Sequence, residues 1–411
     1  MTAPLKLVAP AAYASRGNSN DDIRRHNLSV VLGLVHREHN QSRAQLTRAT
    51  GLNRSTVAGI VAELVDRNLV VEAEPHASLR GRPSQTVWPN PAVVSIAINP
   101  EVDAVSLGLV SLDGTIVKKI RYITDRSPSV REVINISVAI IDAMRADLEA
   151  HYLVVGIGVA IPGQVQSQDG SVRLAPPLGW ENQPIAQLLS EATGFNVFVA
   201  NDAHAGVLAE SKFGAGRGVD ELVYLYGGPS GIGAGIISNG KAVRGAGFAG
   251  GLGHTLVREN GFACRCGSTG CLETEARREQ LLPLIGLENA DEEQLEAALI
   301  DAAMIGSGSP EVLAEVHRQI DYLAVALRNT INILNPRLIS VGGFLASLTA
   351  VAPGRLESLL ATHSLVTSFE GVRIARAELG SNFFVGAAEL AFESLLENPQ
   401  GFRFEAGAPL L

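Results

Sequence analysis

The chain has 411 residues, of which 46% are hydrophobic and 18% charged, and this composition indicates a globular protein with a large core and more than one domain. Its longest uncharged runs contain Pro and many Gly, which argues against a membrane span, and its N-terminus has no apolar run of signal-peptide length, which argues against secretion. Three cysteines cannot build a disulfide framework, so we expect a cytoplasmic protein. The net charge is −9, yet residues 1–90 hold 11 Lys and Arg against 7 Asp and Glu. We therefore expect only this N-terminal segment to approach nucleic acid.

Residues 1–20 are interrupted by prolines and predict a disordered tail, and residues 21–90 predict a winged helix-turn-helix domain. Ser42 is a good N-cap for the second helix, and Gly51 ends that helix in a tight turn. The expected helices and wing strands are 22–39, 42–50, 54–68, 69–71 and 85–88.

The residues predicted to contact DNA are polar or positively charged and fall in three places. The third helix should present its N-terminus to the major groove, the second helix could bind phosphates, and the wing could enter a minor groove. In that order they are Asn53, Arg54, Ser55 and Thr56; Arg43 and Gln45; and Arg80 and Arg82. The alternative is a three-helix module for protein interaction, which the local positive charge disfavours.

From residue 91 onward strands, glycine turns and helices alternate, which predicts an α/β fold of two lobes with a cleft between them. Lobe one is expected at about 91–200 together with a C-terminal helix at about 386–398, and lobe two at about 201–385. Asn201 and Asp202 follow a strand at its carboxyl end, where open α/β sheets place ligand-binding groups.

All three cysteines of the chain lie close together, and one histidine precedes them. His254, Cys264, Cys266 and Cys271 supply one imidazole and three thiolates, the donor set of a closed tetrahedral zinc site. A closed site leaves no position for water, so the sequence predicts a structural zinc ion and no metal catalysis. The alternative is a loop with three free thiols.

These residues resemble the signature of the ROK family (repressors, open reading frames and sugar kinases). The main motif is Cys-x-Cys-Gly-x2-Gly-Cys-Leu-Glu at 264–273; shorter matches are Ile161-Pro162-Gly163, Asn201-Asp202-Ala203, the glycines at 227–235, and Asn335-Pro336 with Gly342-Gly343. The resemblance covers roughly residues 91–400, and the preceding winged helix is similar to that of the repressor branch. It implies an actin-like, ribonuclease-H-like fold, zinc on the sugar-site loop, and an oligomeric repressor released by a sugar.

The resemblance also implies roles for single residues. Asn201 and Asp202 would bind sugar hydroxyls, and in the family's kinases this Asp is the base that activates the accepting hydroxyl. His254 and Glu273 match further sugar contacts, and His254 also matches a zinc ligand beside the three cysteines. Helix N-capping alone is the alternative role for Asp202.

The sequence departs from the family's kinases in two places. Their Asp-x-Gly-Gly-Thr phosphate loop is replaced at 97–103 by Ala-Ile-Asn-Pro-Glu-Val-Asp, in which Pro100 lacks an N–H and Glu101 and Asp103 would repel phosphate. We therefore expect ATP binding and kinase activity to be lost, although the glycines at 227–233 still resemble a phosphate loop. The Glu of the family's Gly-Glu-x-Gly-His string is replaced by Gly251, which predicts room for a substituted, phosphorylated or larger sugar, or for a ligand of another class.

Taken together, the sequence predicts a non-catalytic, DNA-binding transcriptional regulator, a repressor of carbohydrate-metabolism genes that forms a homodimer or homotetramer. A sugar or sugar derivative in the cleft would change its affinity for operator DNA. One alternative is an ATP-dependent sugar kinase that also binds DNA. Another is a regulator controlled by a protein partner.

Overall fold

The computed structural model describes residues 20–73, 85–304, 309–379 and 383–402. The tail predicted for residues 1–20 lies outside these residues except for its last position, and so do Arg80 and Arg82 of the predicted wing. None of the helices in the described ranges combines the length and the apolar character needed to cross a lipid bilayer.

The N-terminal part consists of three helices and a small antiparallel sheet, the arrangement that the winged-helix pattern predicts. Ser42 and Gln45 form a capping box at the start of α2, and Gly51 ends α2 with a φ of 68°, which is why a glycine stands there. The sheet has the order β1-β3-β2. The elements are α1 (Asn20–Glu38), β1 (Gln41–Ser42), α2 (Arg43–Thr50), α3 (Arg54–Asp66), β2 (Val70–Ala73) and β3 (Thr86–Pro89).

Lobe one is built on a five-stranded sheet with the order β11-β7-β4-β5-β6. β4, β5 and β6 form an antiparallel meander, after which β7 and β11 add in parallel through helical crossovers. One face is covered by α4 and α5 and the other by α14, so the central strands are buried on both sides. The elements are β4 (Val93–Pro100), β5 (Ala104–Ser111), β6 (Ile116–Ile123), α4 (Val130–His151), β7 (Leu153–Ile161), α5 (Ile185–Thr193), β11 (Val197–Asn201) and α14 (Phe383–Glu397).

A second small sheet, with the order β10-β9-β8, extends from the end of β7 and packs beside α5 and β11. Its strands are β8 (Gln164–Val165), β9 (Val172–Ala175) and β10 (Trp180–Gln183), with the short helix η1 (Pro176–Leu178) before the last strand.

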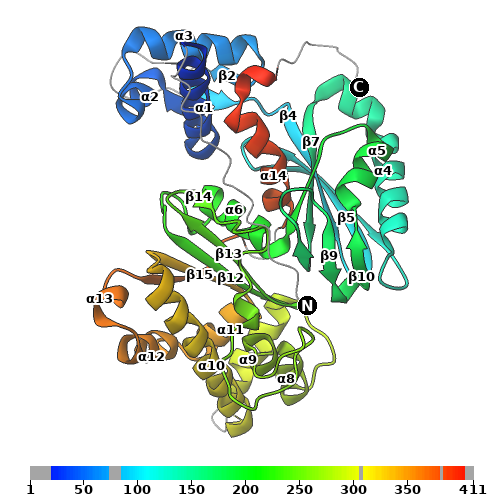
Figure 1. The fold of residues 1–411 in the computed structure, drawn as a ribbon, viewed down its shortest axis with the longest axis vertical. Helices are drawn as coiled ribbons and strands as arrows, with labels where there is room; N and C mark the ends of the chain where they lie inside the picture. The colour runs from blue at the N-terminus through cyan, green and yellow to red at the C-terminus, as the bar shows by residue number, and fades with distance from the viewer. Residues whose placement is uncertain (1–19, 74–84, 305–308, 380–382, 403–411) are drawn as a thin grey trace, which may run out of the picture.

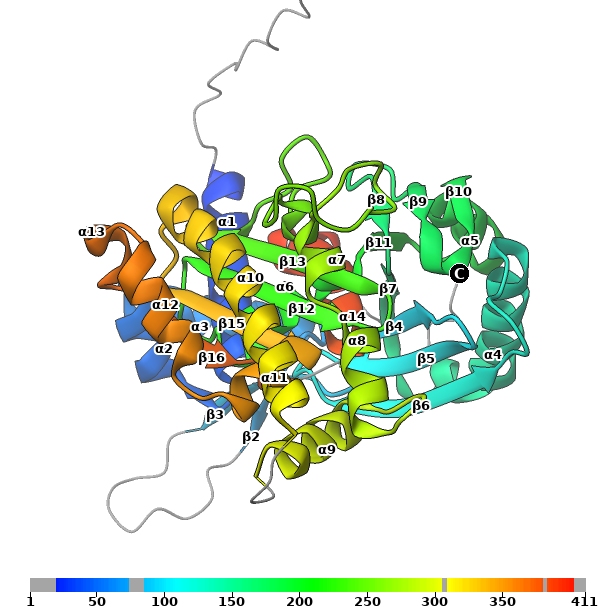
Figure 2. The same ribbon diagram turned by 90° about the horizontal axis from the view of Figure 1, so that it is seen from below.

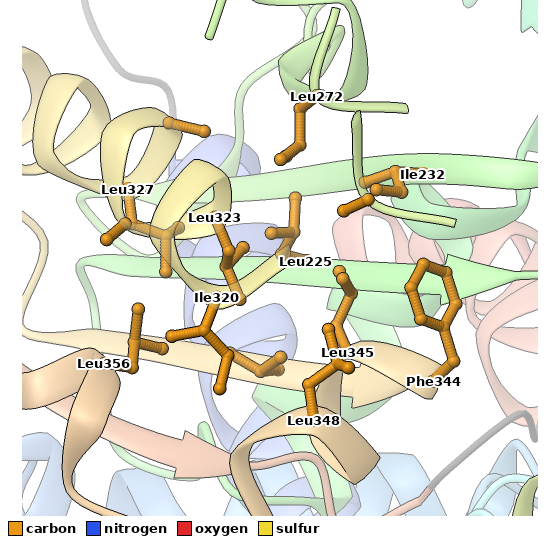
Figure 3. Close-up of a cluster of buried hydrophobic side chains, with 14 of the residues drawn as sticks. Leu225, Ile232, Leu272, Ile320, Leu323, Leu327, Phe344, Leu345, Leu348 and Leu356 are labelled. Carbon is orange, nitrogen blue, oxygen red and sulfur yellow. The ribbon is translucent and has the colours of Figure 1, made fainter. Parts of the chain in front are cut away.

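Lobe two repeats the plan with the sheet β14-β13-β12-β15-β16, which α6 covers on one face and α9 to α12 on the other. Figure 3 shows Leu225 and Ile232 of the strands facing Ile320, Leu323 and Leu327 of α10 in this core. The elements are α6 (Asp202–Phe213), β12 (Leu222–Gly228), β13 (Gly231–Ser238), β14 (Lys241–Ala242), η2 (Leu252–His254), α7 (Leu272–Glu275), α8 (Arg278–Leu281), η3 (Leu282–Ile285), α9 (Glu292–Met304), α10 (Pro310–Leu334), β15 (Leu338–Gly343), α11 (Phe344–Val351), α12 (Arg355–His363), α13 (Val366–Phe369) and β16 (Arg373–Arg376).

Two helices, α6 and α14, lie where the three parts of the molecule meet (Figures 1 and 2). A side chain on Gly386 of α14 would collide with the carbonyl oxygen of Ala205 in α6, so this glycine permits the close crossing of the helices. α1 packs on α14 and on the turn η4 (Pro399–Gly401) that follows it. The apolar core of the winged helix is therefore continuous with that of lobe one through α14.

Candidate functional site

The four predicted metal ligands converge in the loop between η2 and α7. Their ligand atoms all lie within 4.8 Å of one another. Cys264 Sγ is 3.6 Å from His254 Nδ1, and Cys266 Sγ is 3.7 Å from Cys271 Sγ. The ring nitrogen of His254 that faces the Cys264 sulfur is Nδ1.

These separations fit a tetrahedral cation. Zinc–sulfur and zinc–nitrogen bonds of about 2.3 Å and about 2.0–2.1 Å imply ligand–ligand edges of about 3.8 Å for two sulfurs and about 3.6 Å for sulfur and nitrogen. Burial raises the pKa of Cys271 to about 12, whereas the Ser268 amide lowers the pKa of Cys266. A cation offsets the cost of holding such thiolates together, and its binding releases their protons. The cluster can therefore hold a metal ion.

The glycines of this loop have the backbone role that their spacing suggests. Gly267 has a φ of 91° and Gly270 a φ of 70°, both in the left-handed region. A side chain on Gly270 would also collide with the carbonyl oxygen of Arg258. The backbone is thus folded tightly enough to bring the thiols together.

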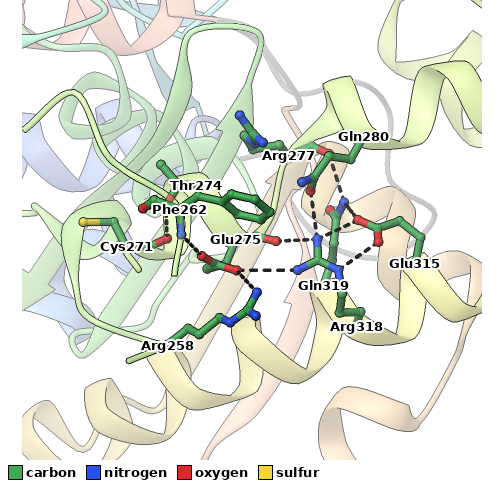
Figure 4. A network of polar contacts seen from close by, with 10 residues as sticks. All are labelled: Arg258, Phe262, Cys271, Thr274, Glu275, Arg277, Gln280, Glu315, Arg318 and Gln319. Carbon is green, nitrogen blue, oxygen red and sulfur yellow. Dashed lines mark hydrogen bonds and ion pairs between the residues drawn. The ribbon is translucent and has the colours of Figure 1, made fainter. Parts of the chain in front are cut away.

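A buried carboxylate that the sequence did not single out, that of Glu275, ties the metal loop to α10 (Figure 4). Its oxygens accept the Phe262 amide at 2.8 Å and lie 3.3 Å from Arg258 and 3.6 Å from Arg318. Arg318 also donates to the main-chain oxygen of Glu275 at 2.9 Å. Because a buried charge is costly unless it is paired, this network fixes the loop against the body of lobe two.

Asn201 and Asp202 lie at the junction of β11 and α6. Asn201 is the N-cap of α6: its Oδ1 accepts the amides of Ala203 and His204, and its Nδ2 donates to Gly163 of lobe one at 3.0 Å. Asp202 is the first residue of the helix and accepts the Ala203 amide at 2.8 Å. Burial raises the pKa of Asp202 to about 6, against the opposing hydrogen bonds from Ala203 and Asn201. Its carboxyl group is thus a desolvated acceptor at the junction of the two lobes.

The first residues of β13 bring the predicted effector ligands together. A Cβ on Gly233 would lie 3.7 Å from Asn201 Oδ1 and from Asp202 Oδ1. Two residues earlier, a Cβ on Gly231 would collide with the Glu273 carboxylate, which accepts the Ile232 amide at 3.2 Å. Gly253, beside His254, approaches so closely that a Cβ would collide with the carbonyl oxygen of Ile232. One short stretch of strand therefore positions Asn201, Asp202, Glu273 and the backbone next to His254.

Gly251 lies at the exposed edge of this cluster. A Cβ built on it meets no atom within 4 Å, and its φ of −70° is open to any residue. A side chain at this position would therefore extend into open space.

The glycines at the ends of β12 and β15 are covered by a side chain. The Tyr226 ring is within contact distance of a Cβ built on Gly228, Gly342 or Gly343, and its hydroxyl donates to Glu292 at 2.7 Å. Burial raises the pKa of this tyrosine, and its ring packs edge-on against Phe383. In the first hairpin, Arg121 pairs with Glu101 at 3.1 Å and with Asp103 at 2.8 Å.

The predicted DNA-contacting residues differ in their exposure and in the contacts that they already make within the protein. Asn53 caps α3 by accepting the Thr56 amide and the Ser55 hydroxyl, and Asn53, Arg54 and Ser55 are exposed. Arg43 is held by Glu72 of β2 through two hydrogen bonds of 2.8 Å, so its charge is neutralised within the domain.

Two further observations concern α2. The Gln45 side chain accepts from the Ser42 amide and hydroxyl in the capping box. Arg48, which the sequence reading missed, is exposed in the last turn and has no ion pair with any described residue. Its only sequence signal is its position on the exposed face of a short basic helix.

The model of the ROK family matches residues 95–394 of the chain. A putative xylose repressor from Caldicellulosiruptor sp. (strain Rt8B.4) is 29% identical over 393 residues, covering 92% of this chain and 98% of the relative. A glucokinase from Thermotoga maritima is 33% identical over 282 residues, covering 65% of this chain and 86% of the relative.

Among solved structures, a ROK family transcriptional regulator that is a homologue of the Escherichia coli MLC protein matches with a TM-score of 0.74 at 25% identity. The match covers 91% of this chain and 97% of that structure. The likeness confirms the predicted two-lobed, actin-like α/β fold, and it extends over nearly the whole chain.

Proposed function

Since this chain belongs to the ROK family, we propose that it is a sequence-specific DNA-binding repressor of carbohydrate-metabolism genes, released from its operator by a sugar or sugar derivative. The observation that carries this proposal is the extent of the similarity. The Caldicellulosiruptor repressor aligns over 92% of the chain, so its match extends beyond residues 95–394 of the family model, whereas the glucokinase aligns over 65% of the chain. The regulator works as a homodimer or homotetramer, because paired DNA-binding domains read symmetric operators.

The start of α3 enters the major groove in this proposal. Asn53, Arg54, Ser55 and Thr56 read base edges there, while Arg80 and Arg82 of the wing reach a minor groove. Arg43 is paired with Glu72, and Gln45 caps α2. These contacts support a role for the two residues in positioning α2, and not in reading bases. The exposed Arg48 supplies a phosphate contact, which makes binding depend on salt.

The effector binds between Asn201, Asp202, Glu273 and His254. Sugar hydroxyls each offer a donor and acceptors, and a desolvated carboxylate beside an amide satisfies both. The Nε2 atom of His254 has no hydrogen-bond partner in the described part of the chain, which leaves it for the ligand. His254, Cys264, Cys266 and Cys271 hold a structural zinc ion that fixes His254 and the neighbouring Glu273.

The protein is not a kinase in this proposal. The Tyr226 ring covers glycines 228, 342 and 343, and Arg121 is already neutralised by Glu101 and Asp103 where a kinase would bind phosphate. Both features support the loss of ATP binding. A second candidate, an ATP-dependent sugar kinase, is favoured by one observation, the pKa of about 6 of Asp202, which would suit a general base.

Operator affinity measured at fixed salt tests the proposal. Operator fragments are selected from the genomic DNA upstream of sugar-utilisation genes, and D-xylose, D-glucose, N-acetyl-D-glucosamine and their phosphates are added one at a time. We expect one of them to weaken binding, and we expect the Asp202→Asn variant to bind DNA without this response. An operator affinity that none of these compounds changes would contradict effector control by sugars.

A coupled assay of ADP release with the same sugars distinguishes the second candidate. We expect no turnover. Sugar-dependent turnover that Asp202→Asn abolishes would establish a kinase instead.

A further inference from the structure

One helix joins the candidate effector cluster to the DNA-binding helices. α6 begins at Asp202 in the cleft and ends at Phe213 beside α1. Its 12 residues span about 18 Å at a rise of about 1.5 Å per residue. A ligand at one end of α6 and the DNA-binding domain at the other therefore contact the same rigid element.

The packing around α6 leaves it no freedom to bend. Residues 203–210 are all buried. A Cβ on Gly206 would collide with the ring of Tyr224, and one on Gly235 would lie 2.5 Å from Val207. Because packed interiors are as dense as organic crystals, a displacement of the first turn of α6 is passed on to the far end of the helix.

At its far end α6 contacts the last turn of α1. The Phe213 ring lies edge-on to the His36 imidazole at 5.2 Å between ring centres, and 6.0 Å from that of His39. Arg217, which follows α6, lies 3.7 Å from Glu38. A movement of Phe213 therefore displaces the last turn of α1 first.

His36 is the most constrained residue of this joint. Its side chain is fully buried; Nδ1 lies 2.5 Å from the Leu112 carbonyl oxygen in lobe one, and Nε2 lies 3.1 Å from Glu389 Oε2 in α14. A carbonyl can only accept, so Nδ1 carries a proton. Buried polar atoms are costly to leave unpaired, so α1 cannot shift gradually: it keeps both partners or loses one.

We propose that His36 is the residue through which the effector cleft acts on the DNA-binding domain, with Phe213 of α6 as its contact. An effector that draws Asp202 toward Glu273 and His254 displaces α6 along α14, and Phe213 transfers this displacement to α1 through His36. The proposal rests on the proposed function and adds the route, because it assigns a positioning role to two residues that contact neither sugar nor DNA. The coupling is reciprocal, so operator DNA weakens effector binding by the same factor.

The Phe213→Leu variant tests this route, with Phe369→Leu as a matched control, because Phe369 is also a half-buried phenylalanine at a helix end and lies in lobe two. Operator affinity is measured with and without D-xylose, D-glucose or N-acetyl-D-glucosamine, and sugar binding is measured directly by calorimetry. We expect a sugar-induced loss of about 5- to 150-fold in the wild type and in Phe369→Leu, and a loss below about twofold in Phe213→Leu. Sugar affinity and sugar-free operator affinity should stay close to the wild type. A full response in Phe213→Leu would overturn the route.

A second measurement needs neither sugar nor DNA. Hydrogen exchange of the α1 amides is compared between the wild type and Asp202→Asn, and then between the same pair carrying Phe213→Leu. We expect Asp202→Asn to change the protection of residues 34–38 at least twofold, and to change nothing there when Phe213 is leucine. Unchanged protection of α1 in the first comparison would overturn the coupling. A change there without any sugar binding would support the coupling and contradict the proposed effector class.

Discussion

The two parts of the junction between the lobes are built in different ways. At the proposed effector part, the Asp202 carboxyl group is desolvated, His254 Nε2 has no hydrogen-bond partner among the described residues, and Gly251 faces open space, so a ligand can make new contacts there. At the glycine part, the Tyr226 ring covers the glycines and the charge of Arg121 is taken up by Glu101 and Asp103, so this cation is not free to bind phosphate. The contrast teaches that the glycine motif alone does not define a nucleotide site, since the side chain packed over the glycines decides what can enter. Four changes break or sharpen this contrast.

The largest effect is expected from removing the metal ligands of the effector part. Cys271→Ala deletes a buried ligand, and structural zinc contributes about 10–16 kcal/mol to the folding of small zinc peptides. We expect the variant to lose its zinc, as measured by elemental analysis, and to lose protection of the 254–273 loop in hydrogen exchange. Ser268→Ala, a change in the same loop that leaves the ligands intact, is the control. Wild-type protein that contains no zinc would contradict the metal assignment.

Opening the glycine part should cost stability without creating a nucleotide site. Tyr226→Ala removes a ring that is 5% exposed, and deletion of a buried aromatic ring costs about 3–5 kcal/mol. We expect a lower urea midpoint and no ATP binding in calorimetry, because Glu101 and Asp103 remain. If the variant binds ATP, then Tyr226 alone closes a site that is otherwise intact.

Removing the charge of Asp202 should raise the stability of the protein, whereas Tyr226→Ala should lower it. The pKa of Asp202 is about 6 in the folded protein against 3.8 in its ordinary environment, so above pH 6 ionisation costs stability, and this cost fades as the pH falls from 6 towards 4. Asp202→Asn should therefore stabilise the sugar-free protein at pH 7.5 by about 2–3 kcal/mol and have little effect near pH 4.

Denaturation by urea at both pH values measures this difference. Asp169→Asn is the control of opposite sign, because a hydrogen bond from Ser171 lowers the pKa of Asp169. A destabilised Asp202→Asn variant at pH 7.5 would mean that the carboxylate has a favourable partner in the free protein.

The smallest effect on stability is expected at Gly251. Gly251→Glu places its side chain in open space with an unstrained φ, so the free energy of unfolding should change by less than about 0.5 kcal/mol. The new carboxylate should nevertheless change the order of sugar affinities towards unsubstituted sugars, since it fills the room left for a substituent. Identical sugar preferences in the wild type and the variant would show that Gly251 is not part of the effector site.

The sequence was informative wherever neighbouring residues decide the structure. The metal loop could be predicted because its ligands and its left-handed glycines lie within one short motif, and the helix caps at Ser42 and Ser129 are equally local. α11 has no such local signal, because it is almost uniformly apolar and shows no helical period.

The contacts that position the site were beyond the sequence because they join distant residues. Arg318 and Glu275 are separated by 43 positions, and His36 and Glu389 by 353. No spacing rule links such pairs. The neutralisation of Arg43 by Glu72 was hidden for the same reason, since it depends on how the wing strand folds back on α2.

The joint at α1 has a consequence for synthesis on the ribosome. Arg67 at the end of α3 donates to the carbonyl oxygens of Gln400 and Phe402, and His36 needs Glu389. At about 5–20 residues per second, these partners are made roughly 20–70 s after the helices that they hold. A nascent chain therefore exposes its N-terminal three-helix domain well before the residues that hold this domain against lobe one have been made.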